Sequence, residues 1–235
     1  KQAFRLVEEG ADIIDVGGES TRPGASIIPQ KQEVCRILPV IKELCKNNIT
    51  VSCDTRNSVT MKKVLDEGVE IINDVSGLNY DKNTLAVIKE YNCYYVLMHS
   101  LGTPSTMQIN PKYENVIKDL YSFFLKKISL IKEENLNLSK IIIDPGIGFG
   151  KNDSHNFQIL KYFSIFLDLG LPILIGLSRK SFIGRFIKNE YADRLPCSLA
   201  LAVDAFLKGA SVIRVHDVKG TKDAIDIFKE ANYWK

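Results

Sequence analysis

The sequence predicts an α/β fold, a TIM (β/α)8 barrel represented by seven βα units, and three observations support this. Short runs rich in Ile and Val recur seven times along the 235 residues, and each ends in polar residues or glycine. Segments with helical periodicity separate the runs. Strands that alternate with helices are typical of a parallel sheet, and this many units in one chain suit a barrel better than a doubly wound sheet.

The strands are expected at short apolar runs, because a strand that is buried on both faces is almost continuously hydrophobic. The runs are ADIIDVGG (11–18), ITVSCDT (49–55), VEIINDVSG (69–77), CYYVLMHS (93–100), KIIIDPG (140–146), PILIGLSR (172–179) and ASVIRVHD (210–217). A closed barrel of this class has an eighth strand. Because the chain opens with the helix-like segment KQAFRLVEEG, we expect the missing first strand to precede Lys1.

The predicted helices between the runs are amphipathic. One apolar stripe comprises Val34, Ile37, Leu38, Ile41 and Leu44. A second stripe predicts a long helix at about 113–134. No linker, repeat or low-complexity segment divides the chain, so we expect residues 1–235 to form a single, N-terminally truncated domain.

Composition excludes several classes of protein. The net charge is only +3 and no long Lys/Arg block occurs, which argues against nucleic acid or a membrane surface as the main partner. No apolar run reaches the roughly 18 residues of a membrane helix. The five cysteines are odd in number and lack a CxxC motif, so we expect buried free thiols in a reducing compartment. The histidines lack zinc-site spacing, and no GxSxG elbow occurs.

Polar side chains follow every predicted strand. They are Asp15 with Glu19, Asp54, Asn73, His99, Asp144, Ser178 with Arg179 and Lys180, and Arg214 with His216. Active sites of barrels lie where the C-terminal strand ends meet, so we expect these groups to converge on one ligand site. For any single one, capping of the next helix is the alternative.

The types of these residues limit the ligand. Asp54, Asn73 and Asp144 offer carboxylate and amide groups, which suit a heterocycle with adjacent N–H and amino donors. Lys180, Arg214 and His216 supply cationic or donor groups for oxygens and anions. The expected ligand is therefore a polar ring linked to a phosphate-like group.

Three loops after the strands add candidates. ESTRPGA (19–25) is either a surface turn or a mobile loop that closes over substrate. SRKSFIG (178–184) places Ser181 near a predicted helix N-terminus, whose N–H groups can bind a carboxylate or phosphate. DPGIGFGK (144–151) matches no nucleotide-binding motif, so we interpret its glycines as a tight turn beneath Asp144.

Together these segments resemble the dihydropteroate synthase family. The matches are GADIIDVGGESTRPGA (10–25), VSCDT (51–55), IINDVSG (71–77), VLMH (96–99), GTPSTMQ (102–108), IIIDPGIGFGK (141–151), IGLSRKSFIG (175–184) and IRVHD (213–217). They follow the family's order and cover nearly the whole chain. The resemblance implies a transferase of folate biosynthesis, which joins 6-hydroxymethyl-7,8-dihydropterin pyrophosphate to para-aminobenzoate and releases pyrophosphate.

The resemblance also implies roles for individual residues. The pterin-binding positions are Asp54, Asn73, Met98, Asp144, Gly176, Lys180 and Arg214. The positions around para-aminobenzoate are Thr21, Arg22, Pro23, Phe149 and Ser181. The pyrophosphate positions are Arg214 and His216, and the expected catalytic residues are Asp54, Lys180 and Arg214.

The implied cofactor is Mg²⁺, and the implied protein is a cytoplasmic homodimer and sulfonamide target that acts on small molecules. The family's first strand carries an Asn that binds the ion, and that strand is not in this sequence, so the metal ligand stays unassigned. We expect a cytoplasmic location, and an organellar location is the alternative.

Two alternatives stand beside this function. A methyltetrahydrofolate-dependent methyltransferase barrel shares the strand-end Asp and Asn residues but lacks the ESTRPGA and SRKSFIG loops. An inactive or truncated homologue would bind pterin without forming product, and the missing first strand motivates this alternative. A pterin-binding assay beside a turnover assay separates it from the synthase.

Overall fold

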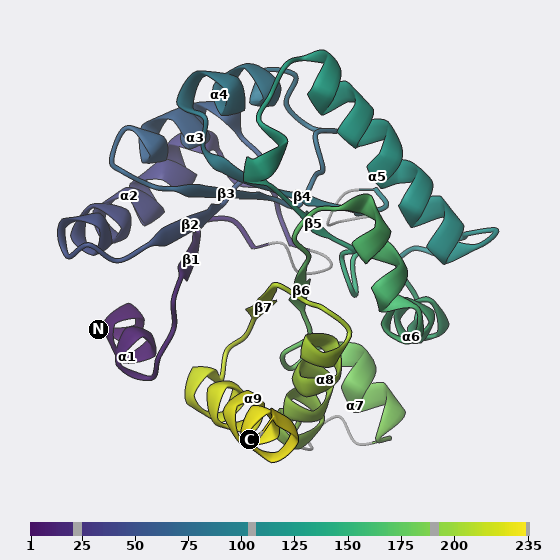
Figure 1. Ribbon diagram of the computed structural model, residues 1–235. Helices are drawn as coiled ribbons and strands as arrows, with labels where there is room; N and C mark the ends of the chain where they lie inside the picture. Colours follow the sequence, from purple (N-terminus) through teal and green to yellow (C-terminus); the bar gives the residue numbers. More distant parts are fainter. Residues whose placement is uncertain (21–24, 103–106, 189–192, 234–235) are drawn as a thin grey trace.

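The computed structural model describes residues 1–20, 25–102, 107–188 and 193–233, and it confirms the predicted order of strands and helices (Figure 1). Each apolar run contains one strand. The strands are β1 (Ile14–Gly17), β2 (Val51–Asp54), β3 (Ile71–Asp74), β4 (Tyr94–Met98), β5 (Ile141–Asp144), β6 (Leu174–Gly176) and β7 (Val212–Arg214). They are shorter than the runs because the polar residues beyond them leave the ladder and form loops.

Helices connect the strands, and α2 to α6 lie on the outer side of the arc of strands (Figure 1). The helices are α1 (Gln2–Glu8), α2 (Gln30–Lys46), α3 (Ser58–Leu65), α4 (Thr84–Tyr91), α5 (Val116–Glu133), α6 (Asp153–Lys161), α7 (Ser181–Phe186), α8 (Leu195–Leu207) and α9 (Val218–Tyr233), with 3₁₀ turns η1 (Leu138–Lys140) and η2 (Phe163–Leu169). The chain opens with a helix, as predicted, and α5 is the predicted long helix. Within the described ranges, no helix is both long and apolar enough to cross a lipid bilayer.

All strand pairs are parallel. Strands β1 to β5 pair in sequence order, and β6 pairs with β7 in a second ladder. One bridge, between Ile143 and Ile173, connects the two ladders. No strand of the described residues pairs with the outer edge of β1 or β7, so these strands form an open arc that confirms the seven predicted βα units (Figure 1).

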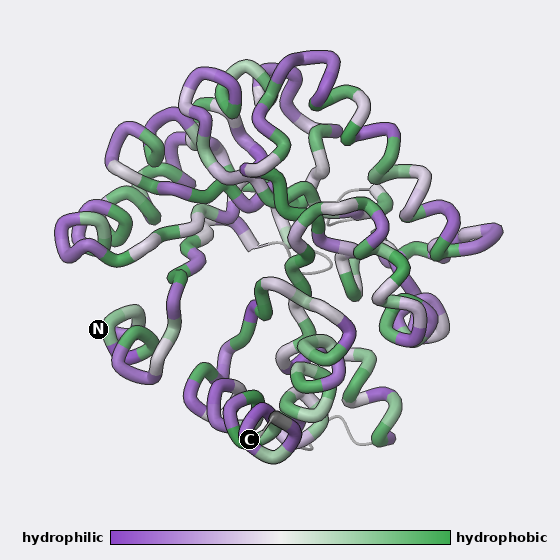
Figure 2. Tube along the Cα trace, viewed as in Figure 1, coloured by the Kyte–Doolittle hydropathy of each residue, from purple (hydrophilic) through white to green (hydrophobic). Residues whose placement is uncertain are grey.

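The main core fills the space between the strands and the surrounding helices. Figure 2 shows green, hydrophobic segments along the strands and alternating green and purple segments along the helices. The first predicted stripe packs as expected, since Ile37, Ile41 and Leu44 of α2 are buried and Leu38 is partly buried. Burial of these apolar side chains is the main stabilising contribution to the fold.

The cysteines are free, as predicted, but the prediction that they are buried was wrong for some of them. Cys53 and Cys93 are buried, whereas Cys35 is exposed. Cys35 lies on α2 beside the buried stripe, on the face that points to solvent. The position on the helix, and not the residue type, decides its exposure.

Candidate active site at the C-terminal strand ends

The inner face of the strands carries a small apolar cluster and, next to it, the predicted site. The cluster contains Ile71, Val96, Ile142 and Leu174, with Ile13 and Val212 packed against it. Successive side chains of a strand point to opposite faces, so residues two positions further point the same way. The residues two positions after the members of the apolar cluster are Asp15, Asn73, Met98, Asp144, Gly176 and Arg214. Strand alternation therefore places the polar groups above the apolar cluster, at one rim.

Asp54 joins this set through the register of the strands. It pairs with Asn73 of β3. Asp144 pairs with Met98, and Gly176 pairs with Arg214. Because parallel strands end at the same edge, these pairings bring residues far apart in sequence into one layer.

Arg214 contacts acidic groups from the opposite end of the arc. Its Nε lies 2.7 Å from Asp15 Oδ2, and its Nη2 lies 3.3 Å from Asp54 Oδ2. Asn73 Nδ2 donates to Asp15 Oδ2 at 3.4 Å. Burial alone would lower the pKa of Arg214, but Asp15 and Asp54 raise it, so the guanidinium stays charged. The structure therefore brings these four residues together at one rim.

Burial also shifts the pKa values of the two acids and the lysine at this rim. Desolvation, with a contribution from Asp15, raises the pKa of Asp54 to about 7, and Arg214 opposes the shift. Desolvation raises the pKa of Asp144, although the Gly146 N–H and Lys180 act in the other direction. The same effect lowers the pKa of Lys180 to about 8. Groups that titrate near neutrality in one place are typical of functional sites.

The glycine-rich segment forms the tight turn predicted beneath Asp144. Gly146 has a φ of +67°, and its N–H donates to Asp144 Oδ1 at 2.7 Å. Gly148 passes against Lys180, since a Cβ there would lie 3.6 Å from the lysine Cδ. The Lys180 ammonium lies 4.5 Å from the centre of the Phe149 ring. Phe149 is thus brought next to the acidic rim.

The remaining predicted residues are placed less centrally. The His216 backbone N–H donates to Ser178 Oγ at 3.2 Å, and its ring Nδ1 lies 3.1 Å from the same oxygen. Ser181 is the first residue of α7, as predicted, and it is exposed. Arg179 pairs with Asp217 instead of the acidic rim. Thr21, Arg22 and Pro23 lie outside the described residues.

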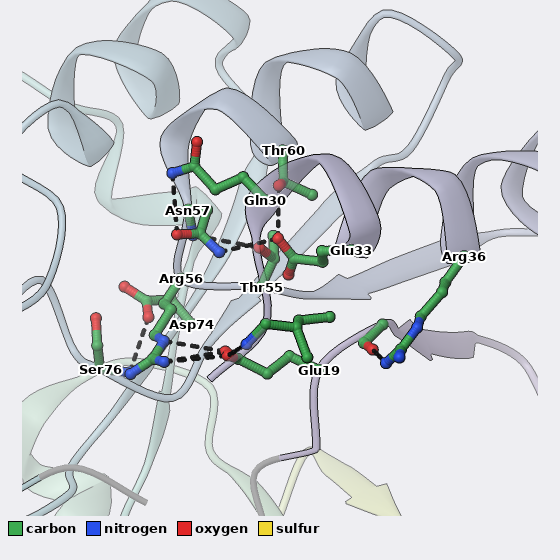
Figure 3. A network of polar contacts seen from close by, with 12 residues as sticks. Glu19, Gln30, Glu33, Arg36, Thr55, Arg56, Asn57, Thr60, Asp74 and Ser76 are labelled. Carbon is green, nitrogen blue, oxygen red and sulfur yellow. Dashed lines mark hydrogen bonds and ion pairs between the residues drawn. The ribbon is translucent and has the colours of Figure 1, made fainter. Parts of the chain in front are cut away.

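Two features of the site go beyond the sequence prediction, which placed Asp15 and Glu19 among the strand-end residues but assigned neither of them a partner. Asp15 contributes a buried Oδ1 that has no hydrogen-bond partner, and its strand-end position was the available signal. A buried network lies beside the rim (Figure 3), in which Glu19 accepts hydrogen bonds from Arg56 Nε at 3.1 Å and from the Ile28 N–H at 3.2 Å. In the same network, Glu33 accepts from Thr60 Oγ1 at 2.6 Å. Glu19 is one of the predicted strand-end residues, whereas Arg56, Glu33 and Thr60 match no sequence motif, because residues of these types are common on protein surfaces.

The described residues do not form a complete Mg²⁺ site. Among them, no group of three or more His, Cys, Asp or Glu side chains is placed to hold a metal ion. The buried oxygens without partners, Asp15 Oδ1 and Asn73 Oδ1, are of the chemical type that Mg²⁺ prefers. However, the Arg214 guanidinium already neutralises the neighbouring carboxylates Asp15 and Asp54.

The arrangement is suited to a flat, nitrogen-rich ring that carries an anionic group. Carboxylates and an amide can accept and donate paired hydrogen bonds at the ring edge, and Asp144 is buried enough to make such bonds strong. Lys180 and Arg214 provide the positive charge for an anion beside the ring. Polar groups thus line the rim, and the apolar cluster closes it from below.

Comparison with known proteins agrees with this geometry. Residues 1–216 match the pterin binding enzyme family. The chain is 39% identical over 228 residues to dihydropteroate synthase from Escherichia coli K12, covering 97% of this chain and 80% of that protein. The structure of the Yersinia pestis dihydropteroate synthase in a sulfonamide drug complex superposes with a TM-score of 0.94 at 35% identity, covering 100% of this chain and 85% of that chain. Another similar structure is the Xanthomonas albilineans dihydropteroate synthase with 4-aminobenzoic acid (TM-score 0.92, 34% identity, 100% of this chain and 84% of that chain).

Proposed function

The chain belongs to the family of pterin-binding enzymes, and we propose that it is a dihydropteroate synthase. It is then a transferase that joins 6-hydroxymethyl-7,8-dihydropterin pyrophosphate to para-aminobenzoate and forms dihydropteroate and pyrophosphate. The observation that carries this proposal is the convergence of Asp54, Asn73, Asp144, Lys180 and Arg214 on one rim of the strands. The similarity to dihydropteroate synthases over nearly the whole chain supports it.

The acidic rim is proposed to bind the pterin. Asp144 accepts hydrogen bonds from the aminopyrimidine edge, because its buried carboxylate offers two oxygens to adjacent N–H groups. Asn73 and Asp54 complete the polar contacts. Met98 and Gly176, which share the inner face of the strands, border the ring. Because Met98 is apolar and Gly176 has no side chain, the flat face of the ring can pack closely against the protein here.

The cations are proposed to receive the pyrophosphate. The residues at the ends of β6 and β7, or a few positions beyond them, are Lys180, Arg214 and His216. The positive charge of Arg214 and Lys180 stabilises the leaving group as the carbon–oxygen bond breaks, and the His216 ring offers a further N–H donor. Departure leaves a cationic methylene on the pterin, and the Asp54 carboxylate stabilises that charge.

The aminobenzoate is proposed to bind beside Phe149, with Ser181 near its carboxylate. Thr21, Arg22 and Pro23 are assigned to the same pocket by the resemblance of ESTRPGA to the family. The aniline nitrogen is unprotonated near neutral pH, so it attacks the methylene without a strong general base. Loss of one N–H proton then completes the neutral product.

Mg²⁺, a homodimer and a cytoplasmic location belong to the proposal through the resemblance to the family. Because the described residues do not form a complete Mg²⁺ site, every step above is assigned to protein groups. Size-exclusion chromatography with light scattering tests the dimer. Titration of Mg²⁺ in the turnover assay tests the ion.

Turnover with both substrates tests the proposed function directly. The purified chain should form dihydropteroate only when the pterin pyrophosphate and para-aminobenzoate are both present, and calorimetry should detect pterin binding. Pterin binding without product would favour the inactive homologue. Methyl transfer from methyltetrahydrofolate, without dihydropteroate formation, would favour the methyltransferase barrel.

A further inference from the structure

Lys151 is a buried charged residue that the proposed reaction does not use. Its side chain is 1% exposed. The ammonium lies 3.0 Å from His99 Nδ1, and it donates to the His99 carbonyl at 3.2 Å and to the Phe149 carbonyl at 3.0 Å. An ammonium has three N–H groups, so all of them are used. None of these partners is a carboxylate, although burying an ammonium without one in contact costs free energy.

His99 is suited to its part in this arrangement. Burial, together with the nearby Lys151, lowers the pKa of His99 to about 2, so the ring is neutral. A neutral ring can accept a hydrogen bond at Nδ1. Burial also lowers the pKa of Lys151 to about 7, while Asp144 favours its charged form. His99 therefore serves as an acceptor for the lysine.

Lys151 joins two segments that the strands leave close together. The His99 N–H donates to the Asp144 carbonyl at 2.9 Å, which continues the β4–β5 pairing beyond both strands. The glycine-rich turn then passes so close to His99 that a Cβ on Gly146 would lie 2.0 Å from the His99 carbonyl oxygen. The Lys151 ammonium reaches back across this contact to Phe149.

Donors from elsewhere in the chain hold the neighbouring carbonyls of the turn. Gln108 Nε2 donates to the Gly148 carbonyl, and Tyr113 Oη donates to the Gly150 carbonyl at 2.8 Å. The Phe149 carbonyl lies between these two and accepts from Lys151. The backbone on both sides of the Phe149 side chain is thus fixed by hydrogen bonds.

We propose that Lys151 is a positioning residue that holds the backbone of Phe149 and thereby keeps the Phe149 ring beside Lys180. This ring is half-buried and faces the lysine ammonium at 4.5 Å. The consequence for para-aminobenzoate rests on the proposed function, since Phe149 is assigned to that substrate there. Lys151 itself contacts neither substrate and acts through Phe149.

A fluorescent reporter tests the positioning without any assay of activity. Trp234 is replaced by Phe, and Phe149→Trp then introduces the single tryptophan. In this background, Lys151→Met should raise the acrylamide quenching constant of the tryptophan about twofold, because the freed backbone lets the ring move into solvent. Lys208→Met is the control, since Lys208 also donates to a backbone carbonyl, that of Leu160 at 2.7 Å, but Leu160 and Asp204, to which it donates, lie outside the glycine-rich turn. Lys208→Met should leave the quenching unchanged.

Steady-state kinetics of Lys151→Met in the otherwise unchanged chain test the consequence for the substrates. The KM for para-aminobenzoate should rise about tenfold while the KM for the pterin pyrophosphate changes less than about twofold. An unchanged quenching constant would overturn the positioning role, and so would equal quenching changes in the Lys151 and Lys208 variants. A raised quenching constant with an unchanged KM for para-aminobenzoate would overturn the link to that substrate. Absence of turnover in the unsubstituted chain would count against the proposed function, and the quenching result would still decide the role of Lys151.

Discussion

At the scale of single residues, Asp144 shows how burial prepares a group for one ligand. Its carboxylate is buried, and its Oδ1 receives one backbone hydrogen bond, from the Gly146 N–H. Each carboxylate oxygen can accept two hydrogen bonds, so both oxygens can still accept from a ligand. Asp144→Asn keeps the size but replaces one acceptor with a donor. We expect pterin affinity to fall about 10- to 100-fold in calorimetry, because a charge-assisted pair of hydrogen bonds is lost.

The control for this prediction is Asp153→Asn, which removes an acid that pairs with Arg185 outside the rim. It should leave the affinity for pterin unchanged. If Asp144→Asn also binds pterin with the original affinity, Asp144 is not part of the pterin site.

Asp54 and Lys180 together predict the pH dependence of the reaction. The pKa of Asp54 is raised to about 7, so its carboxylate is charged above that pH. The pKa of Lys180 is lowered to about 8, so its ammonium is charged below that pH. If both charges are needed, kcat/KM for the pterin pyrophosphate rises through about pH 7 and falls through about pH 8.

The acidic side of this profile belongs to Asp54. In Asp54→Asn, residual kcat/KM should no longer rise between pH 6 and pH 7.5, since no carboxylate is left to ionise. A profile with the same acidic limb in this variant would assign that limb to another group.

The buried ion pair between Arg56 and Glu19 predicts a large effect on stability. Both side chains are at least nine-tenths buried, and their closest N–O distance is 3.1 Å. Arg56→Met leaves the Glu19 carboxylate buried without its cation, so the free energy of unfolding should fall by about 3–5 kcal/mol. Urea denaturation followed by circular dichroism measures this.

Arg185→Met provides the matched comparison, because Arg185 and Asp153 form an exposed pair. Its loss should cost less than about 1 kcal/mol. Similar losses in the two variants would show that Glu19 is well hydrated in the absence of Arg56.

At the scale of elements, the glycine-rich turn depends on space as well as on backbone conformation. Gly146 and Gly170 have nearly equal φ angles, +67° and +69°. A Cβ at Gly146 would lie 2.0 Å from the His99 carbonyl, whereas a Cβ at Gly170 meets nothing within 4 Å. Gly170→Ala should cost about 1 kcal/mol from backbone strain alone, and Gly146→Ala about 3 kcal/mol or more.

Thermal and urea unfolding of both alanine variants measure the difference. Equal losses of stability in the two variants would mean that the turn can move away from His99 at no cost in free energy. Such a movement would also shift Phe149, so the KM for para-aminobenzoate in Gly146→Ala gives an independent check.

The elements themselves were the most predictable part of the fold. Every apolar run contains a strand, because a strand buried on both faces requires an unbroken set of apolar residues. The stripe of α2 was equally clear, since its period matches the helical turn. The grouping of the polar strand ends could be predicted as well. Parallel strands end at the same edge of the sheet, and the alternation of side chains decides which residues face inward there.

At the scale of the whole molecule, the strands form two unequal ladders. Strands β3 and β4 each have a paired neighbour on both sides, whereas β6 and β7 pair mainly with each other and reach β5 through one bridge. We expect the hydrogen-bonded amides of β6 and β7 to exchange at least about tenfold faster than those of β3 and β4, through a local opening.

Hydrogen exchange measured by mass spectrometry on peptides that cover each strand tests this expectation. A bound pterin that contacts both ladders should reduce the difference in exchange rate between them, because the ligand binds only when both ladders are in place at the rim. Equal protection of both ladders in the free protein would show that the strands open as one cooperative unit.

The sequence by itself determined the order of strands and helices, the single rim and most of its polar residues, because these follow from local periodicity and strand-end position. Only the tertiary structure decided which polar groups meet: Arg214 pairs with Asp15 and Asp54, Arg179 pairs with Asp217, and Lys151 donates to the Phe149 carbonyl. These contacts depend on distances between segments more than 30 residues apart or on the path of a tight turn. Residue types and spacing do not encode such distances, since they are set by how the strands and helices pack.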